Sequence, residues 1–346
     1  MLGACQDWRS TVNRGCTGVG MDGFFPLDTG RRRTLKAAIG CVGIGLHSGR
    51  RVSLTLRPAA AGTGILFRRT DIGLELPARY DHVVDTRLCT ALGIPGDAPA
   101  HRIGTVEHVM AALAGCGVDD AVVELDGPEV PILDGSAAPF VFLLDCTGLI
   151  AHGGLGTAEA EVIEVLRPVR VQEGEGPDAA WAELAPGLGD RLEASLTIDF
   201  PTTAIGRQSL ALRLTPQAFR AGLADARTFT LAEDVARLRA AGLAQGGSLA
   251  NAVVVDGPLV LNPGGLRRPD EFVRHKLLDV VGDLALAGAP LRGRFSGHRS
   301  GHALNNRLLR ALFADRVNWR ALPGLLVGEG AAPRLPAAAA AAPAVA

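Results

Sequence analysis

Alternating apolar and polar positions predict strands in the first half of the chain. Residues 51–57 (RVSLTLR) alternate with the period of two expected of a half-buried strand. Residues 121–125 (AVVEL) form a second strand candidate, which is followed by the turn-forming sequence DGP. Between them, the apolar stretch 106–114 predicts a short helix, and the preceding Thr105 is a good candidate for its N-cap.

The second half of the chain mixes the same element types. Strands are expected at 192–200 and 251–256. Helices are expected at three places, namely 231–241, 270–287 and 302–313. Because strands and helices do not alternate as regular βαβ units in either half, the pattern favours an α+β fold over a doubly wound parallel sheet.

Composition divides the chain into an extension, two halves and a tail. Residues 1–30 lack periodicity and are expected to form a loose extension, whereas the Ala/Pro-rich residues 331–346 are expected to be disordered. The small, Gly-rich stretch 147–161 predicts a seam between two α+β domains. The first domain is expected over 31–150 and the second over 160–325.

Charge and apolar content exclude several functional classes. The formal net charge of −1 provides no basic field for nucleic acid. The apolar runs of the chain, such as 140–144, are far shorter than a membrane span, so an integral membrane protein is not expected. The six cysteines form no C-x-x-C pair, and the first thirty residues contain no continuous apolar segment of a signal peptide. We therefore expect a cytoplasmic protein with free thiols.

The strongest chemical signal lies in the helix predicted over 270–287. His275, Asp279 and Asp283 are spaced by four residues, so all three project from one face of a helix. A histidine and a carboxylate one turn apart can bind one metal ion, and a second carboxylate can orient a ligand. A solvated face carrying ordinary charges remains the alternative.

Two further histidines are candidates for the same chemistry. His108 could be a third metal ligand, with the adjacent Glu107 as general base, although Glu107 could equally stabilise the helix N-terminus through the dipole. His302 precedes a helical run and could act as a general acid or as an electrophile toward an oxyanion, or it could be a surface residue near the helix start. Residues 43–49 lack the Walker lysine and predict a tight turn, and Ser136 lies in no nucleophile elbow and is interpreted as structural.

Several motifs occur in a fixed order along most of the chain. They are residues 43–49, 64–71, 105–108, 112–115, 128–136, 226–229, 246–248, 271–276 and 300–306. Over roughly residues 32–322, this series resembles the UDP-3-O-acyl-N-acetylglucosamine deacetylases, zinc hydrolases of the committed step of lipid A biosynthesis. The resemblance implies two similar two-layer α/β sandwich domains, packed with their helices facing each other and the active site between them.

The resemblance also implies roles for individual residues. His108, His275 and Asp279 would be the zinc ligands, and Glu107 would be the general base. His302 would be the general acid, oriented by Asp283. Lys276 would anchor the phosphate or carbonyl region of the substrate, and Thr228 would hydrogen-bond near the metal.

The resemblance further implies how the substrate is held. Phe229 would pack on the sugar, and an insert at about 228–256 would form an apolar passage for the acyl chain. The passage residues would be Leu231, Val235, Leu243, Ser248 and Val254. Cys89 and His47 match positions that line the cleft, whereas Thr230 stands where the family usually has glycine.

The expected cofactor is therefore Zn²⁺, although a site of two histidines and a carboxylate also suits Fe²⁺. The expected partner is the UDP-3-O-acyl-N-acetylglucosamine substrate, and the protein is expected to be a monomer. Two alternatives remain open: a zinc deacetylase acting on another N-acetyl sugar, and a non-catalytic protein that binds a nucleotide-linked lipid.

Overall fold

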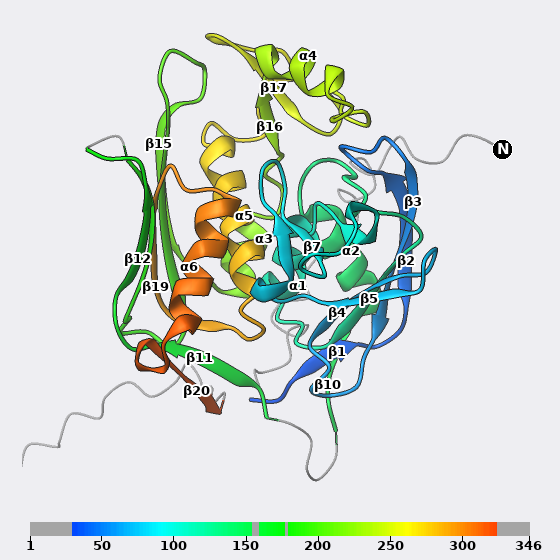
Figure 1. Ribbon diagram of the computed structural model, residues 1–346, viewed down its shortest axis with the longest axis vertical. Helices are drawn as coiled ribbons and strands as arrows, with labels where there is room; N and C mark the ends of the chain where they lie inside the picture. The colour runs from blue at the N-terminus through cyan, green and yellow to red at the C-terminus, as the bar shows by residue number, and fades with distance from the viewer. Residues whose placement is uncertain (1–29, 154–158, 177–178, 324–346) are drawn as a thin grey trace, which may run out of the picture. The chain divides into compact units, whose positions relative to one another are not determined.

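The computed structural model describes residues 30–153, 159–176 and 179–323 (Figure 1). The predicted extension, apart from Gly30, and the predicted tail at 331–346 lie outside these ranges. All the described residues belong to one compact unit, so the division into two domains stays a prediction. None of the helices in the described ranges combines the length and the apolar character that a membrane span requires.

The first half builds a five-stranded sheet. Its strands, in spatial order, are β2 (Ile39–Ile44), β3 (Arg51–Pro58), β9 (Ala121–Leu125), β4 (Ile65–Arg69) and β5 (Leu74–Pro77). All neighbours are antiparallel except β4 and β9. Helices α1 (Glu107–Gly115) and α2 (Ala138–Thr147) pack against each other, and α2 also contacts β2.

The second half builds a seven-stranded sheet. Its strands are β11 (Glu161–Val165), β12 (Val169–Glu173), β13 (Ala180–Ala185), β14 (Leu192–Phe200), β15 (Gly206–Arg213), β19 (Leu291–His298) and β20 (Trp319–Pro323). Strand β19 is central, because it pairs with β11, β13 and β14. Helix α5 (Glu271–Ala285) covers β14 and β15, and helix α6 (His302–Ala314) covers β12 and β13.

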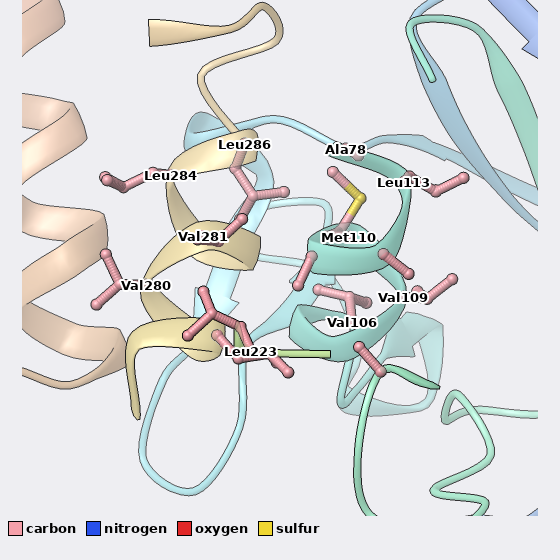
Figure 2. Close-up of a cluster of buried hydrophobic side chains, with 14 of the residues drawn as sticks. Ala78, Val106, Val109, Met110, Leu113, Leu223, Val280, Val281, Leu284 and Leu286 are labelled. Carbon is pink, nitrogen blue, oxygen red and sulfur yellow. The ribbon is translucent and has the colours of Figure 1, made fainter. Parts of the chain in front are cut away.

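The helices of the two halves pack directly on each other. Figure 2 shows Met110 of α1 facing Val281 and Leu286 of the α5 region in a buried apolar cluster. The backbones touch at Gly282, where a Cβ atom would lie only 2.0 Å from the carbonyl oxygen of Glu107. The order of layers is therefore sheet, helices, helices, sheet, and the predicted α+β fold class is confirmed.

Smaller elements lie outside the two large sheets. Strands β1 (Arg33–Leu35) and β10 (Leu149–Ala151) form a two-stranded sheet, and β6 (Val83–Asp85), β7 (Ala91–Gly93) and β8 (Arg102–Ile103) form a three-stranded sheet. The others are α3 (Pro216–Gly222) and three 3-10 turns at Tyr80–His82, Pro99–His101 and Arg316–Asn318. The predicted insert contains β16 (Phe229–Leu231), α4 (Ala232–Ala240), β17 (Val253–Asp256) and β18 (Leu259–Val260). Helix α4 packs on β16 and β17 (Figure 1).

One local prediction is wrong, and one predicted strand is shorter than expected. Thr105 does not cap α1, because its hydroxyl donates to the buried carboxylate of Glu129 at 2.9 Å and the helix begins at Glu107. The strand expected at 251–256 begins only at Val253, because the Asn251 side chain accepts from Ser248 N (2.8 Å) and donates to Gly246 O (3.0 Å). These side-chain bonds hold the preceding residues in a turn. The remaining predicted helices and strands agree with the structure to within two residues.

Candidate active site

Three predicted metal ligands converge where α1 meets α5. His108 comes from the first turn of α1, and His275 and Asp279 lie one turn apart on α5. Their ligand atoms all lie within 4.8 Å of one another, and all three side chains are buried. The Nε2 atoms of His275 and His108 lie 3.3 and 3.6 Å from the same oxygen, Oδ1 of Asp279.

The unsatisfied atoms of this cluster fit a cation. Oδ1 of Asp279 is buried and has no hydrogen-bond partner among the described residues, whereas Oδ2 accepts from Lys276 Nζ at 2.9 Å. Nδ1 of His275 lies 3.0 Å from the carbonyl oxygen of Ala226. Because a carbonyl only accepts, Nδ1 carries the hydrogen and Nε2 keeps its lone pair for a metal. Two histidines and a carboxylate are a common donor set for zinc.

Protonation states also suit metal binding. Burial lowers the pKa of His275 to about 4, so its imidazole is neutral at pH 7. Burial alone would raise the pKa of Asp279, but His275 and the ammonium of Lys276 hold it well below its usual value. The site therefore presents neutral imidazole and anionic carboxylate, which are the forms that bind metal ions.

Glu107 lies beside this cluster at the start of α1. Its side chain is buried, and Oε2 accepts from the backbone N–H of Thr90 at 3.0 Å. Oε1 lies 4.0 Å from Nε2 of His302. Burial raises the pKa of Glu107 above its usual value, which makes it a better proton acceptor than an exposed carboxylate.

His302 forms a pair with Asp283. Its Nδ1 donates to Oδ2 of Asp283 at 2.8 Å, and the same oxygen accepts from Asn305 Nδ2 at 2.8 Å. The other oxygen, Oδ1, accepts from the hydroxyl of Thr90 at 2.5 Å. Burial alone would lower the pKa of His302, but the Asp283 carboxylate raises it to about 9. His302 is therefore a cation at neutral pH with Nε2 directed toward Glu107.

These groups open into a cavity of about 500 Å³. The predicted site residues that line it are Glu107, His108, His275, Lys276, Asp279, His302, His47, Thr228, Phe229 and Leu231. The remaining predicted site residues lie outside this lining within the described chain: Asp283, Cys89, Val235, Leu243, Ser248 and Val254. A separate cavity of about 720 Å³ lies on β13, β14, β15 and β19 and shares none of the predicted residues.

Three residues of the site have no predicted role from the sequence. Asn305 follows His302 by three residues, so helical spacing could have identified it as a partner of the same carboxylate. Thr90 gives no such signal, because it meets Asp283 across 193 residues of chain. Glu129 accepts from the N–H groups of His47 (2.8 Å) and Ser48 (2.9 Å) and so holds the predicted turn 43–49 at the cavity edge.

Comparison with known proteins agrees with this arrangement. The family model described as LpxC, UDP-3-O-acyl N-acetylglycosamine deacetylase, matches residues 32–314. A relative from Acidithiobacillus ferrooxidans is 48% identical over 292 residues, covering 84% of this chain and 92% of its own length. One from Anaeromyxobacter dehalogenans is 47% identical over 306 residues (88% and 94%), and one from Shewanella frigidimarina 45% over 290 residues (83% and 91%). All three are named UDP-3-O-acyl-N-acetylglucosamine deacetylase, and the chain belongs to this family.

Proposed function

We propose that this protein is a metal-dependent hydrolase that removes the N-acetyl group of a UDP-3-O-acyl-N-acetylglucosamine. The products are the free amine and acetate, and the reaction is a step of lipid A biosynthesis. The names of the relatives support the substrate. The main support for the chemistry is one buried cluster in which three converging ligand atoms lie beside the carboxylate of Glu107 and the cationic imidazole of His302.

His108, His275 and Asp279 would hold the metal ion, for which zinc is the first choice and Fe²⁺ also suits the donor set. A bound zinc ion supplies Lewis acidity toward an amide carbonyl and lowers the pKa of water. Lys276 keeps Asp279 ionised and fixes its orientation through their 2.9 Å ion pair.

Glu107 and His302 divide the proton transfers of amide hydrolysis between them. Glu107, held by Thr90 N–H, accepts the proton of the attacking water. Nε2 of His302 donates a proton to the departing amine, which would otherwise be a poor leaving group. Asp283 holds Nδ1 and stabilises the imidazolium before the transfer. Since the two groups face each other across 4.0 Å, both reach the same reacting centre.

The cavity wall provides surfaces for the rest of the substrate. Phe229 is held edge-on against Phe200, Phe272 and His275 and offers an aromatic surface to the sugar. Leu231 lies in the cavity wall at the start of the insert that would receive the acyl chain, where each buried methylene contributes roughly 0.8 kcal/mol. The names of the relatives favour an acylated substrate over another N-acetyl sugar.

Metal analysis combined with a deacetylation assay tests the proposal. Glu107→Ala is expected to keep stoichiometric zinc but to lose most of the turnover, whereas His108→Ala is expected to lose the metal. Glu75→Ala is the matched control, because Glu75 is an exposed carboxylate on β5 that forms an ion pair with Arg68 of β4. Absence of zinc in the parent, with background activity after zinc addition, would refute the metal mechanism. Full kcat in Glu107→Ala would refute the assignment of the base.

A further inference from the structure

A further buried carboxylate, that of Glu271, lies one turn before His275 on α5 and takes no part in the chemistry above. Glu271 is 0% exposed. Its Oε1 accepts from the backbone N–H of Arg227 at 3.0 Å and from Nε of the same residue at 2.8 Å. Its Oε2 accepts from Arg227 Nη2 at 3.1 Å and from the backbone N–H of Arg267 at 2.6 Å. Four hydrogen bonds therefore converge on one carboxylate beside the candidate metal centre.

One of these bonds connects Glu271 to a metal ligand through a single peptide group. The N–H of Arg227 and the carbonyl of Ala226 belong to the same peptide unit. That carbonyl accepts from Nδ1 of His275 at 3.0 Å. In a trans peptide the N–H and C=O bonds point in opposite directions, so the unit is held by Glu271 at one end and by His275 at the other. Both side chains come from the same helix, four residues apart.

This connection has a physical consequence for His275. A hydrogen bond to a charged acceptor polarises the amide group, which increases the negative charge on its carbonyl oxygen. A stronger acceptor holds the Nδ1–H of the imidazole more firmly, and this raises the basicity of Nε2 toward a metal. Metal-binding histidines often donate directly to a carboxylate or to a carbonyl, and here a carboxylate acts through a carbonyl.

We propose that Glu271 is a positioning residue of the metal centre, which sets the orientation and ligand strength of His275 through the 226–227 peptide. The inference rests on the proposed function, because it concerns the metal affinity of the same site. It also gives Arg227 a role: its guanidinium compensates the buried charge, and its own Nη2 is anchored on Gly265 O at 2.9 Å.

The alternative is that Glu271 only fastens the loops before α5 to the helix. Arg267 supports that reading in part, since it donates to Asp134 Oδ2 (2.9 Å) and to Asp225 O (2.7 Å) and so ties three segments together. A fastening role predicts a loss of stability alone. A positioning role predicts a loss of metal affinity in protein that is fully folded.

The test is the zinc dissociation constant of Glu271→Gln, measured by competition with a chelator at fixed pH. The measurement is made far below the melting temperature, where unfolding does not contribute. The substitution keeps an acceptor oxygen but removes the charge that polarises the peptide. We expect zinc binding to weaken roughly 10- to 100-fold, the range found for groups that support metal-binding histidines. Asp270→Asn is the matched control, because Asp270 precedes Glu271 and forms an ion pair with Arg274 on the same helix. It is expected to leave the constant unchanged.

The outcomes separate this inference from the proposed function. Equal zinc affinity in Glu271→Gln and the parent would overturn the inference and leave the proposed function intact. A parent that binds no zinc would overturn both. If Glu271→Gln does not fold, the test is made on the parent protein alone by measuring the chemical shift of the Arg227 amide proton with and without zinc. Zinc is expected to change this shift more than it changes the shift of the Thr228 amide proton, which donates to Gly135 O. An equal or smaller shift would overturn the inference.

Discussion

The pair of His302 and Asp283 gives the sharpest quantitative prediction. The pKa of His302 rises from its ordinary 6.5 to about 9 in the folded protein, although burial opposes this. The side chains of His302 and Asp283 are only 11% and 3% exposed, so solvent screens their attraction little. The difference between the two values corresponds to roughly 3 kcal/mol of stabilisation of the folded state.

The direction of the pH dependence follows from the raised pKa. Since the folded protein holds the proton more tightly than the unfolded chain, the stabilisation is complete below pH 6.5 and is lost as the pH rises through about 9. In Asp283→Asn the attraction of Asp283 disappears, while burial and the smaller attraction of Glu107 and Asp279 remain. The pKa of the imidazole is therefore expected to fall well below 9.

Two measurements on the metal-free protein check this expectation. Urea unfolding at pH 6 and pH 9.5 should show a decline in the free energy of unfolding that is larger in the parent than in Asp283→Asn, by up to about 3 kcal/mol. An NMR titration of His302 reports its pKa directly. Asp145→Asn, at a half-exposed carboxylate paired with Arg220, corrects for the general pH dependence of the protein. Equal declines in parent and variant, or a His302 that still titrates near 9 in Asp283→Asn, would refute the reasoning.

Two further substitutions test how the site is assembled. Gly282→Ala is expected to destabilise the fold by about 3 kcal/mol in urea unfolding, because the new Cβ would lie 2.0 Å from Glu107 O. Gly301→Ala, where no atom lies within 4 Å of the added Cβ, should change stability little, and an equal loss in both variants would contradict the close approach. Thr90→Val should cost about 1.5–3 kcal/mol of folding free energy through the lost hydrogen bond to Asp283, whereas Thr90→Ser should retain it. A Thr90→Val variant as stable as the parent would show that this bond contributes nothing.

Residue spacing in the sequence is sufficient to predict the part of the site that lies on a single helix. His275, Asp279 and Asp283 share a face of α5 because helical geometry places residues four apart above one another. The same argument explains why alternation located β3, β9 and β14 nearly to the residue. For His108 and His302 the residues alone leave a metal or acid–base role as one of two alternatives, and the family resemblance is what assigns them to the same site, because periodicity within one segment does not relate it to another.

Side-chain hydrogen bonds between distant segments explain where local reasoning failed. Thr105 has the composition of an N-cap, but its hydroxyl is taken by Glu129, 24 residues away. Asn251 interrupts an otherwise apolar run, and its amide group holds a turn that shortens the strand. In both cases the deciding partner is visible only when the chain is folded, because propensity describes a residue with its neighbours and not with remote acceptors.

Spacing along the chain is enough to show which chemistry is available to this protein: a helix face with a histidine and two carboxylates, and two more histidines at predicted helix starts. The physical contacts that make these groups one site arise only when the helices pack. Gly282 lets the backbone of α5 touch the first turn of α1, which brings His108 within reach of Asp279. Thr90 then links Glu107 and Asp283 through its amide and its hydroxyl. Such contacts depend on how whole elements pack, and packing is a property of the folded chain that local periodicity does not contain.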